Sequence, residues 1–478
     1  MSQILVLGIG GLDADLLRVY GPSLPNLRRL MLESPFLDLR STIPPEPVPA
    51  WSSVYTGLNP ANHGMLTRMD CLERVIPDAQ NFQAEPFWEK AARAGKHVCV
   101  FNPLLARSEH TIKGLVVANA GSASHGANSS NDAFPPLLDE PLIPTASQLL
   151  SFCTGLRERT EQQVAVALER FTRESWDLFF VQLDALDHIQ HFLWRYSDPS
   201  DPMYPGKNEH ANSILNFYRL FDQIVGRFRA VLPAECVFAI VSSHGHERRC
   251  TYRLHINEWL REQNFLTPEG QPAGQQDSRQ QGWRTYLSDL CSSLLPWSKG
   301  KAKINHSIDQ QKSAARLVEL ANSSSSCGGI SINRAMLERE GRNYELVREA
   351  ILTGLEQLNI KDTPVVNWVR TREQCYQGKH LDLYPDIIFE LRSDFGVGRG
   401  LFGPLAVADS THRLVSGTHS SQGVFLIENW PEDLEVYEDF LTPSVMDVAP
   451  TLLRLLELPD SPLDGQALVY PRPVRQLI

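Results

Sequence analysis

The sequence lacks the features that direct a chain into a membrane or an oxidising compartment. No apolar run approaches the roughly 18–20 residues that a membrane-spanning helix needs. The chain opens on an apolar segment, Ile4 to Leu7, that predicts a strand, and not on a basic stretch with a cleavage site. Its eight cysteines are scattered and form no CxxC pair, a usage typical of free thiols in a reducing compartment. We therefore expect a cytoplasmic protein without a membrane partner.

An excess of basic residues is also missing. Lysine and arginine number 45 against 56 aspartates and glutamates, which gives a net charge of −11. This balance argues against a nucleic-acid partner, although a local basic patch could still hold an anionic substrate. The 478 residues are 42% hydrophobic, a composition typical of a globular protein with a sizeable core. The length allows one large α/β domain with insertions, or two or three domains.

The stretch 179–191 carries the strongest chemical signal. It begins as a near-continuous apolar run, which predicts a strand buried on both faces, and ends in two carboxylates and two imidazoles. An open α/β sheet places its ligand site at the carboxyl ends of such strands. Asp187 and His191 are four residues apart, so both can reach one divalent cation. The pair Asp184 and His188 has the same step and is an alternative. In the purely structural interpretation, Asp187 caps a helix.

Further motifs are spread along the chain. A proline-rich loop leads into a short helix expected from about Trp51 to Thr56, which Gly57 ends. The other motifs are Gly8-Ile9-Gly10-Gly11 after the first strand, Val241-Ser242-Ser243-His244-Gly245, Asn257-Glu258-Trp259-Leu260, Pro385-Asp386-Ile387-Ile388, Ser416-Gly417-Thr418-His419, Asp447-Val448-Ala449-Pro450-Thr451 and Asp464-Gly465.

Together, these motifs resemble the type I phosphodiesterase / nucleotide pyrophosphatase family of the alkaline phosphatase superfamily. The resemblance covers the chain end to end, with gaps at roughly 66–165 and 262–325. It implies an α/β fold with a mixed, mostly parallel sheet flanked by helices. It further implies a single domain over 1–478, in which the two gaps are insertions that form cap or lid regions.

The resemblance also implies a metal site. Family members hold two divalent metals at the carboxyl edge of the sheet, beside a threonine or serine nucleophile. The ligands of one metal correspond to Asp187, His191 and His419, and all three are present. A carboxylate and two imidazoles with an open position make a catalytic type of site. We expect one ion, zinc, with iron or manganese as alternatives.

The second metal site is degraded in this sequence. The family's two aspartates fall on Gly10 and Ser243, so that only His244 remains as a ligand, and the nucleophile falls on Pro47. Proline has no hydroxyl, and a lone imidazole would hold a divalent ion weakly. Glu46, next to Pro47, is expected to supply a carboxylate.

These residues predict a metal-dependent hydrolase of ester bonds, resembling phosphodiesterases, that has kept one metal. Water would then attack directly, without a covalent intermediate, and His244, Glu46 and His246 are the candidate catalytic residues. The substrate would be a small molecule, a phosphate ester. Two alternatives stay open. The chain could be an inactive pseudoenzyme that serves as a binding or scaffold protein. It could also be a single-metal enzyme of different chemistry, such as a lyase, an isomerase or a non-haem iron protein.

Overall fold

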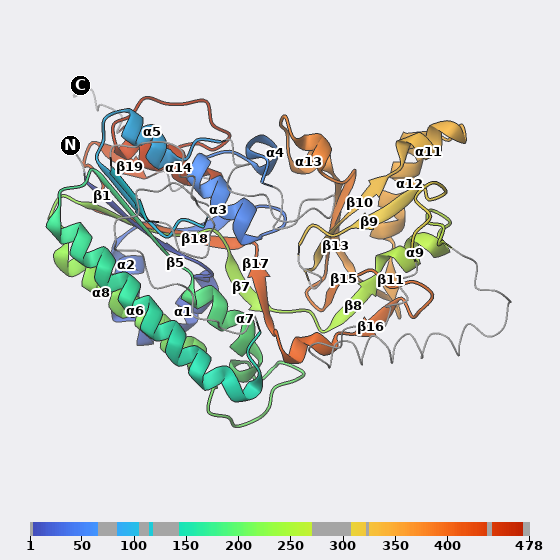
Figure 1. The fold of residues 1–478 in the computed structure, drawn as a ribbon, viewed down its shortest axis with the longest axis horizontal. Coiled ribbons are helices and arrows are strands. Elements are labelled where there is room, and N and C mark those ends of the chain that lie inside the picture. The colour runs from blue at the N-terminus through green and yellow to red at the C-terminus, as the bar shows by residue number, and fades with distance from the viewer. Residues whose placement is uncertain are drawn as a thin grey trace, which may run out of the picture. The chain divides into compact units, whose positions relative to one another are not determined.

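The computed structural model describes residues 3–65, 84–104, 114–117, 143–269, 307–321, 325–436 and 442–471. These residues form two compact units (Figure 1). Unit 1 holds the described residues up to Glu247 and those from Ser416 onward, and unit 2 holds those between Arg248 and Val415. The predicted cap insertions fall partly outside the described residues. The prediction of a single domain with two insertions therefore stays a prediction.

Unit 1 is built on a seven-stranded sheet in the order β2-β18-β6-β1-β5-β3-β4. Strands β1, β5, β6, β3 and β4 run parallel, whereas β18 is antiparallel to both of its neighbours. The mixed, mostly parallel sheet predicted from the sequence is thus confirmed. Its strands are β1 (Ile4–Ile9), β2 (Phe36–Arg40), β3 (Val98–Phe101), β4 (Gly114–Val117), β5 (Leu178–Leu183), β6 (Val237–Ser242) and β18 (Gln422–Glu428).

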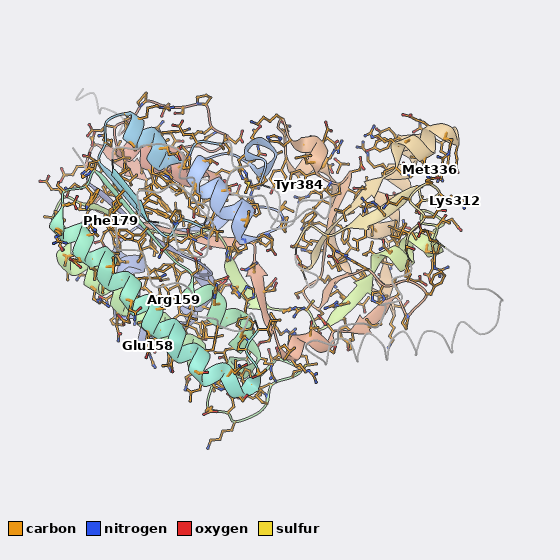
Figure 2. All side chains as sticks on the ribbon, in the orientation of Figure 1. Glu158, Arg159, Phe179, Lys312, Met336 and Tyr384 are labelled. Atoms are coloured by element: carbon orange, nitrogen blue, oxygen red, sulfur yellow. The ribbon has the colours of Figure 1, made fainter. Side chains whose placement is uncertain are left out.

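The central strands are buried on both faces because helices cover both sides of the sheet. Side chains along a strand alternate between faces, so Leu5 and Leu7 of β1 join one core cluster while Ile4 and Val6 join the other. Phe179 of β5, labelled in Figure 2, lies in the first cluster. Phe171 packs edge-on against it. The continuous apolar runs seen in the sequence reflect this double burial.

The first cluster is covered by helices α1 (Ala14–Tyr20), α2 (Pro25–Glu33), α6 (Leu149–Arg173), α7 (Ala185–Ser197) and α8 (Ser213–Val231). The second is covered by α3 (Pro47–Thr56), α5 (Phe87–Arg93) and α14 (Val448–Leu455). Helix α3 ends at Gly57 in the left-handed conformation, as predicted, but it begins at Pro47 instead of Trp51. The remaining α-helix and strands of unit 1 are α4 (Pro60–His63), β7 (Gly245–Arg248, whose last residue is assigned to unit 2), β17 (Gly417–Ser420), β19 (Leu434–Val436) and β20 (Val469–Pro471).

Unit 2 has its own hydrophobic core between an antiparallel sheet, β13-β14-β10-β9, and its helices. A second sheet has the order β15-β8-β16. The elements are β8 (Tyr252–His255), α9 (Ile256–Glu262), β9 (Ala315–Val318), β10 (Cys327–Ile332), α11 (Arg334–Arg339), α12 (Tyr344–Glu356), β11 (Asn359–Ile360), β12 (Thr363–Pro364), β13 (Val366–Thr371), α13 (Arg372–Cys375), β14 (Ile387–Leu391), β15 (Phe395–Gly398) and β16 (Ala406–Ala408).

The structure also bears on the cysteines and on the predicted absence of a membrane-spanning helix. The six cysteines within the described residues are all free thiols. No helix among the described ranges combines the length and the apolar character needed to cross a bilayer.

Candidate metal centre

The candidate site lies in unit 1, beyond the carboxyl ends of the neighbouring strands β1, β5 and β6. Helix α7 follows β5 and carries Asp187 and His191 on successive turns. The two-stranded ribbon of β7 and β17 brings His246 and His419 to the same place. Residues about 230 positions apart in the chain are gathered in this way because parallel strands end at one edge of a sheet.

Asp187, His191, His246 and His419 form one tight group. One ligand atom from each lies within 4.8 Å of the others. The Nε2 atoms of His191 and His419 are 3.0 Å apart, and Nε2 of His419 is 3.4 Å from Oδ1 of Asp187. Nδ1 of His246 is 3.6 Å from the same oxygen. The structure thus places together the three ligands that the family resemblance implied and adds His246.

The tautomers of the imidazoles are set by groups behind them. Nδ1 of His191 donates to the carbonyl of Gly417 at 3.1 Å, and Nδ1 of His244 donates to that of Gly245 at 3.2 Å. Nδ1 of His419 faces Oε1 of Glu46 at 3.6 Å. Each arrangement directs Nε2 toward the group, which is how metal-binding histidines are usually oriented.

Several polar atoms in and beside the group are buried without a hydrogen-bond partner. They include Oδ1 of Asp187, Nε2 of His244 and both ring nitrogens of His246. Buried polar atoms are seldom left unpaired, because the loss of hydration costs about 1–3 kcal/mol each. A divalent cation would satisfy them, and carboxylate and imidazole are the ligands it prefers. The residues therefore fit a metal ion.

Burial and mutual charge set the protonation of the site. Burial lowers the pKa of His191 and of His244 to about 4, which keeps both imidazoles neutral and able to coordinate. Burial also opposes the charged form of His419, but the carboxylates of Glu46 and Asp187 outweigh it and raise the pKa of His419 to about 10. Without an ion, a proton on His419 thus offsets the buried carboxylates.

The structure describes the residues that the sequence assigned to a degraded second metal site. His244 is 1% exposed, and its Nε2 lies 4.0 Å from Oδ1 of Asp187. Ser243 is buried, and its hydroxyl lacks a hydrogen-bond partner. Pro47 is the first residue of α3 and offers no hydroxyl. At Gly10, an added Cβ atom would lie 2.8 Å from Oδ1 of Asp184, so that carboxyl group already fills the space.

The alternative pair Asp184 and His188 is not brought together with the group. His188 is exposed on α7. Oδ1 of Asp184 accepts a hydrogen bond from Nε2 of Gln182 at 2.9 Å. Neither residue belongs to the ligand group formed by the described residues.

Glu46 and His246 have roles that local sequence could not specify. Glu46 is the N-cap residue of α3, yet its side chain makes no capping bond and instead faces His419. The sequence suggested His246 only as an acid or base, although it is 3% exposed and lies among the ligands. The backbone N–H of His246 donates to Oδ2 of Asp13 at 3.1 Å. An added Cβ on Gly245 would lie 2.7 Å from the backbone carbonyl oxygen of Gln422, so glycine is required there.

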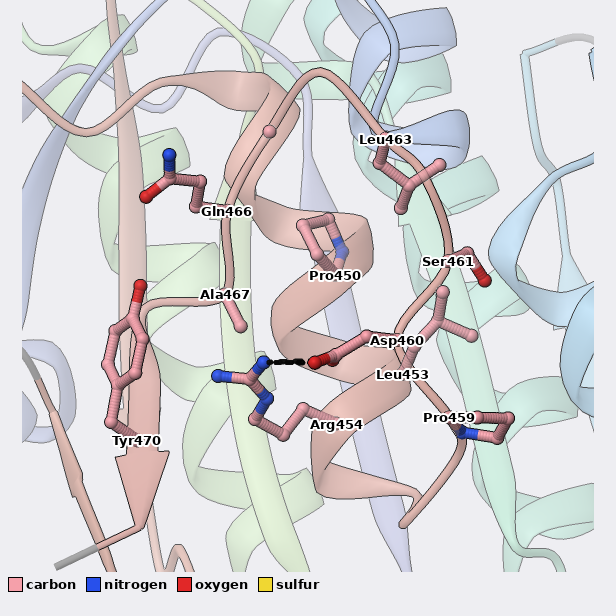
Figure 3. Close-up of a pocket in the computed structure, with 11 residues that line it drawn as sticks. Pro450, Leu453, Arg454, Pro459, Asp460, Ser461, Leu463, Gln466, Ala467 and Tyr470 are labelled. Atoms are coloured by element: carbon pink, nitrogen blue, oxygen red, sulfur yellow. Dashed lines mark hydrogen bonds and ion pairs between the residues drawn. The ribbon is translucent and has the colours of Figure 1, made fainter.

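A separate pocket of about 260 Å³ lies near the carboxyl end of the chain (Figure 3). Nη2 of Arg454 donates to Oδ1 and Oδ2 of Asp460 at 2.8 and 2.9 Å, and the guanidinium lies 5.2 Å from the centre of the Tyr470 ring. The pocket contains none of the predicted site residues. Its charged groups neutralise each other, so we place the functional site at the metal group.

Comparisons with known proteins give one family match. The sequence model of the family described as "type I phosphodiesterase / nucleotide pyrophosphatase" matches residues 4–397. No match was found among curated protein sequences.

Similar solved structures share the fold. Phosphonoacetate hydrolase from Sinorhizobium meliloti 1021, in complex with phosphonoformate, has a TM-score of 0.59 and 14% identity, over 95% of each chain. An inactive form of murine ectonucleotide pyrophosphatase / phosphodiesterase 5, in complex with AMP, has a TM-score of 0.53 and 14% identity, over 98% of this chain and all of that one. The human protein of the same name has a TM-score of 0.52 and 13% identity, over 97% of each chain.

Proposed function

Because the chain belongs to the type I phosphodiesterase / nucleotide pyrophosphatase family, we propose that it hydrolyses phosphate esters with a single divalent ion. The observation that carries this proposal is the convergence of Asp187, His191, His246 and His419, whose ligand atoms lie within 4.8 Å of one another. Four ligands at one point, two of them buried and two half-buried, and a lone His244 beside them favour one ion over the family's two.

The donor set is suited to zinc. Imidazole and carboxylate ligands also suit iron(II), and a carboxylate suits manganese(II), so both are alternatives. When bound, such an ion supplies two things: it polarises a phosphoryl oxygen, and it lowers the pKa of a coordinated water to about 7.

The residues of this chain favour direct attack by water. Pro47 stands where the resemblance places the nucleophile, so no hydroxyl is available there to form a covalent intermediate. His244 has a free Nε2 next to the ligand group. Its depressed pKa, caused first by burial, keeps it neutral at pH 7, so it can accept the proton of the attacking water. Glu46 orients His419.

The substrate is a small molecule that carries a phosphoryl or phosphonyl group. Two of the similar solved structures hold phosphonoformate and AMP, and we carry only the shared chemistry, an anionic phosphorus centre, over to this chain. The acidic balance of the sequence gives no support for a nucleic-acid substrate.

The proposal is tested with zinc-loaded protein and two chromogenic substrates, a p-nitrophenyl phosphodiester and p-nitrophenyl phosphate. We expect turnover of at least one, with one ion per chain, and a fall to background in Asp187→Asn. The matched control Asp433→Asn, at an exposed site outside the group, should keep both activity and metal. Turnover that survives in Asp187→Asn would contradict the proposal.

A non-catalytic role is the second candidate, and one observation favours it. Four protein ligands can close a tetrahedral zinc site and leave no open position, as in structural sites. In that case the same protein would hold one tightly bound ion and turn over neither substrate. The metal would then raise the thermal stability without supporting hydrolysis.

A further inference from the structure

The four residues of the metal group lie on two separate carriers. Asp187 and His191 lie on helix α7, whereas His246 and His419 lie on the ribbon that β7 and β17 form. The ligands of a bound ion must be held within about 0.5 Å of their working positions. The ribbon must therefore be fixed against the helix, and the short segment 11–13, just after β1, connects the two.

The backbone of Gly11 approaches both carriers closely. Gly11 has a φ of +72°, and a Cβ atom built on it would lie 2.9 Å from Cα of Asp187 and 3.1 Å from Nδ1 of His246. Glycine serves twice here, because it adopts a positive φ without strain and because it leaves this space free. Segment 11–13 therefore packs directly against one ligand of each carrier.

Buried hydrogen bonds fix this segment to the helix α7. Nε2 of Gln190, the residue before His191, donates to the carbonyl of Gly11 at 2.7 Å. The hydroxyl of Tyr218 on α8 accepts from the backbone N–H of Asp13 at 3.1 Å and donates to Oε1 of Gln190 at 3.3 Å. Gln190 and Tyr218 are both buried, and a fully paired network of this kind is rigid.

The side chain of Asp13 fixes the same segment to the ribbon. Its Oδ2 accepts the backbone N–H of His246 at 3.1 Å and the hydroxyl of Ser420, the residue after His419, at 3.4 Å. Its Oδ1 accepts the backbone N–H of Leu16 at 2.9 Å and so caps helix α1. The two oxygens thus have different uses: one caps a helix, and the other holds both strands of the ribbon.

We propose that Asp13 is a positioning residue of the metal centre, whose second oxygen sets the two ribbon histidines against the helix α7. The cap of α1 does not explain that oxygen, because an N-cap needs a single acceptor and serine would supply it. Asp13 acts through the backbone of His246 and is not itself in the ligand group. This inference rests on the single-ion site of the proposed function and does not depend on hydrolysis.

The test replaces Asp13 by serine, which caps helices as well as aspartate does but leaves the ribbon without its acceptor. We expect the zinc dissociation constant, measured by competition with a chromophoric chelator, to rise by about 10–100-fold. The visible bands of the cobalt-substituted protein should shift as well, because the ribbon histidines change their positions. A second variant, Asp13→Gly, removes the whole side chain and keeps a residue that N-caps accept. It should show the same two changes.

The matched control is Asp222→Ser on α8. Asp222 is also a buried aspartate of unit 1 that uses both oxygens. They accept the backbone N–H of Leu27 at 2.8 Å and Nδ2 of Asn26 at 3.0 Å, which fixes α2 to α8. The control should lower the midpoint of chemical denaturation and leave the zinc dissociation constant and the cobalt bands unchanged. It therefore separates a loss of positioning from a general loss of stability.

The outcomes separate this inference from the proposed hydrolysis. A wild-type zinc dissociation constant in a folded Asp13 variant, or an equal rise in Asp222→Ser, overturns the positioning role. Loss of folding in both Asp13 variants also overturns it, because the carboxylate would then serve the whole fold. A wild type that binds one zinc ion but turns over neither chromogenic substrate overturns the hydrolysis alone. A wild type that binds no zinc overturns the single-ion site and this inference with it.

Discussion

Oε1 of Glu46 lies 3.6 Å from Nδ1 of His419, and Glu46 directly precedes Pro47, the residue on which the family resemblance places the nucleophile. An N-cap side chain normally accepts a bond from the N2 or N3 amide. Here N1 and N3 of α3 are Pro47 and Pro49, which have no N–H, so the demand for a cap is reduced. The Glu46 carboxylate is free to orient His419, a use of carboxylates that is common behind metal-binding histidines.

Replacing Glu46 by glutamine should weaken the metal site without abolishing it. Loss of the partner carboxylate lowers the basicity of His419 and loosens its orientation, which typically costs about 10–100-fold in metal affinity. The dissociation constant for zinc, measured by competition with a chromophoric chelator, checks this expectation. Glu432→Gln, at an exposed position, serves as the control. An unchanged affinity in Glu46→Gln would show that the carboxylate does not support His419.

His246→Ala should weaken zinc binding and change the coordination of a substituted cobalt ion. With four protein ligands, cobalt should give an intense visible spectrum, which is typical of low coordination numbers. In His246→Ala a water would take the place of the imidazole, and the intensity should fall. His188→Ala is the comparison, because His188 is exposed on the same helix as His191 and should leave the spectrum intact. Identical spectra for His246→Ala and wild type would remove His246 from the ligand set.

Metal binding should release about one proton per ion at pH 7–8. Without an ion, His419 holds a proton because Glu46 and Asp187 raise its pKa to about 10. The ion needs the neutral imidazole, so protonation competes with it. The affinity for the ion should therefore rise with pH, by up to tenfold per pH unit. The rise begins above pH 4, where His191 becomes neutral, and ends at about pH 10, where His419 loses its proton. Calorimetry in two buffers of different ionisation enthalpy counts the protons. No proton release at pH 7 would contradict the assignment.

Gly10→Asp alone should not restore a second metal. The Cβ atom of the new side chain would lie 2.8 Å from Oδ1 of Asp184, so that carboxyl group must shift, and such overpacking costs about 1–3 kcal/mol in the free energy of unfolding. Chemical denaturation measures the loss of stability, and metal analysis counts the bound ions. Gly21→Asp is the control, since a Cβ built on Gly21 has nothing within 4 Å.

Replacing Asp184 as well should allow a second metal ion to bind. The combination of Gly10→Asp and Ser243→Asp with Asp184→Ala supplies two carboxylates beside His244 and frees the space. This variant should bind two ions per chain. A second ion in Gly10→Asp with Asp184 intact would show that Asp184 does not block the site.

Much of the fold could be predicted because its signals are local. The apolar runs of β1 and β5 follow from burial on both faces, and the step from Asp187 to His191 follows from helical spacing. The ligand set of Asp187, His191 and His419 was reached through the family resemblance, and the structure gathers these residues at one point.

The remaining features depend on contacts that no local pattern encodes. His246 turns inward because β7 pairs with β17, more than 150 residues later in the chain. The orientation of Asp184 depends on Tyr55 and Gln182, which are 127 residues apart. Glu46 reaches His419 only once β17 is in place.

The central claim, one ion held by Asp187 and three histidines, is tested most directly by equilibrium dialysis of the purified chain against zinc, followed by elemental analysis. We predict one tightly bound ion per chain in wild type and none in His419→Ala at the same free zinc concentration. Two ions in wild type, or one that persists in His419→Ala, would contradict it.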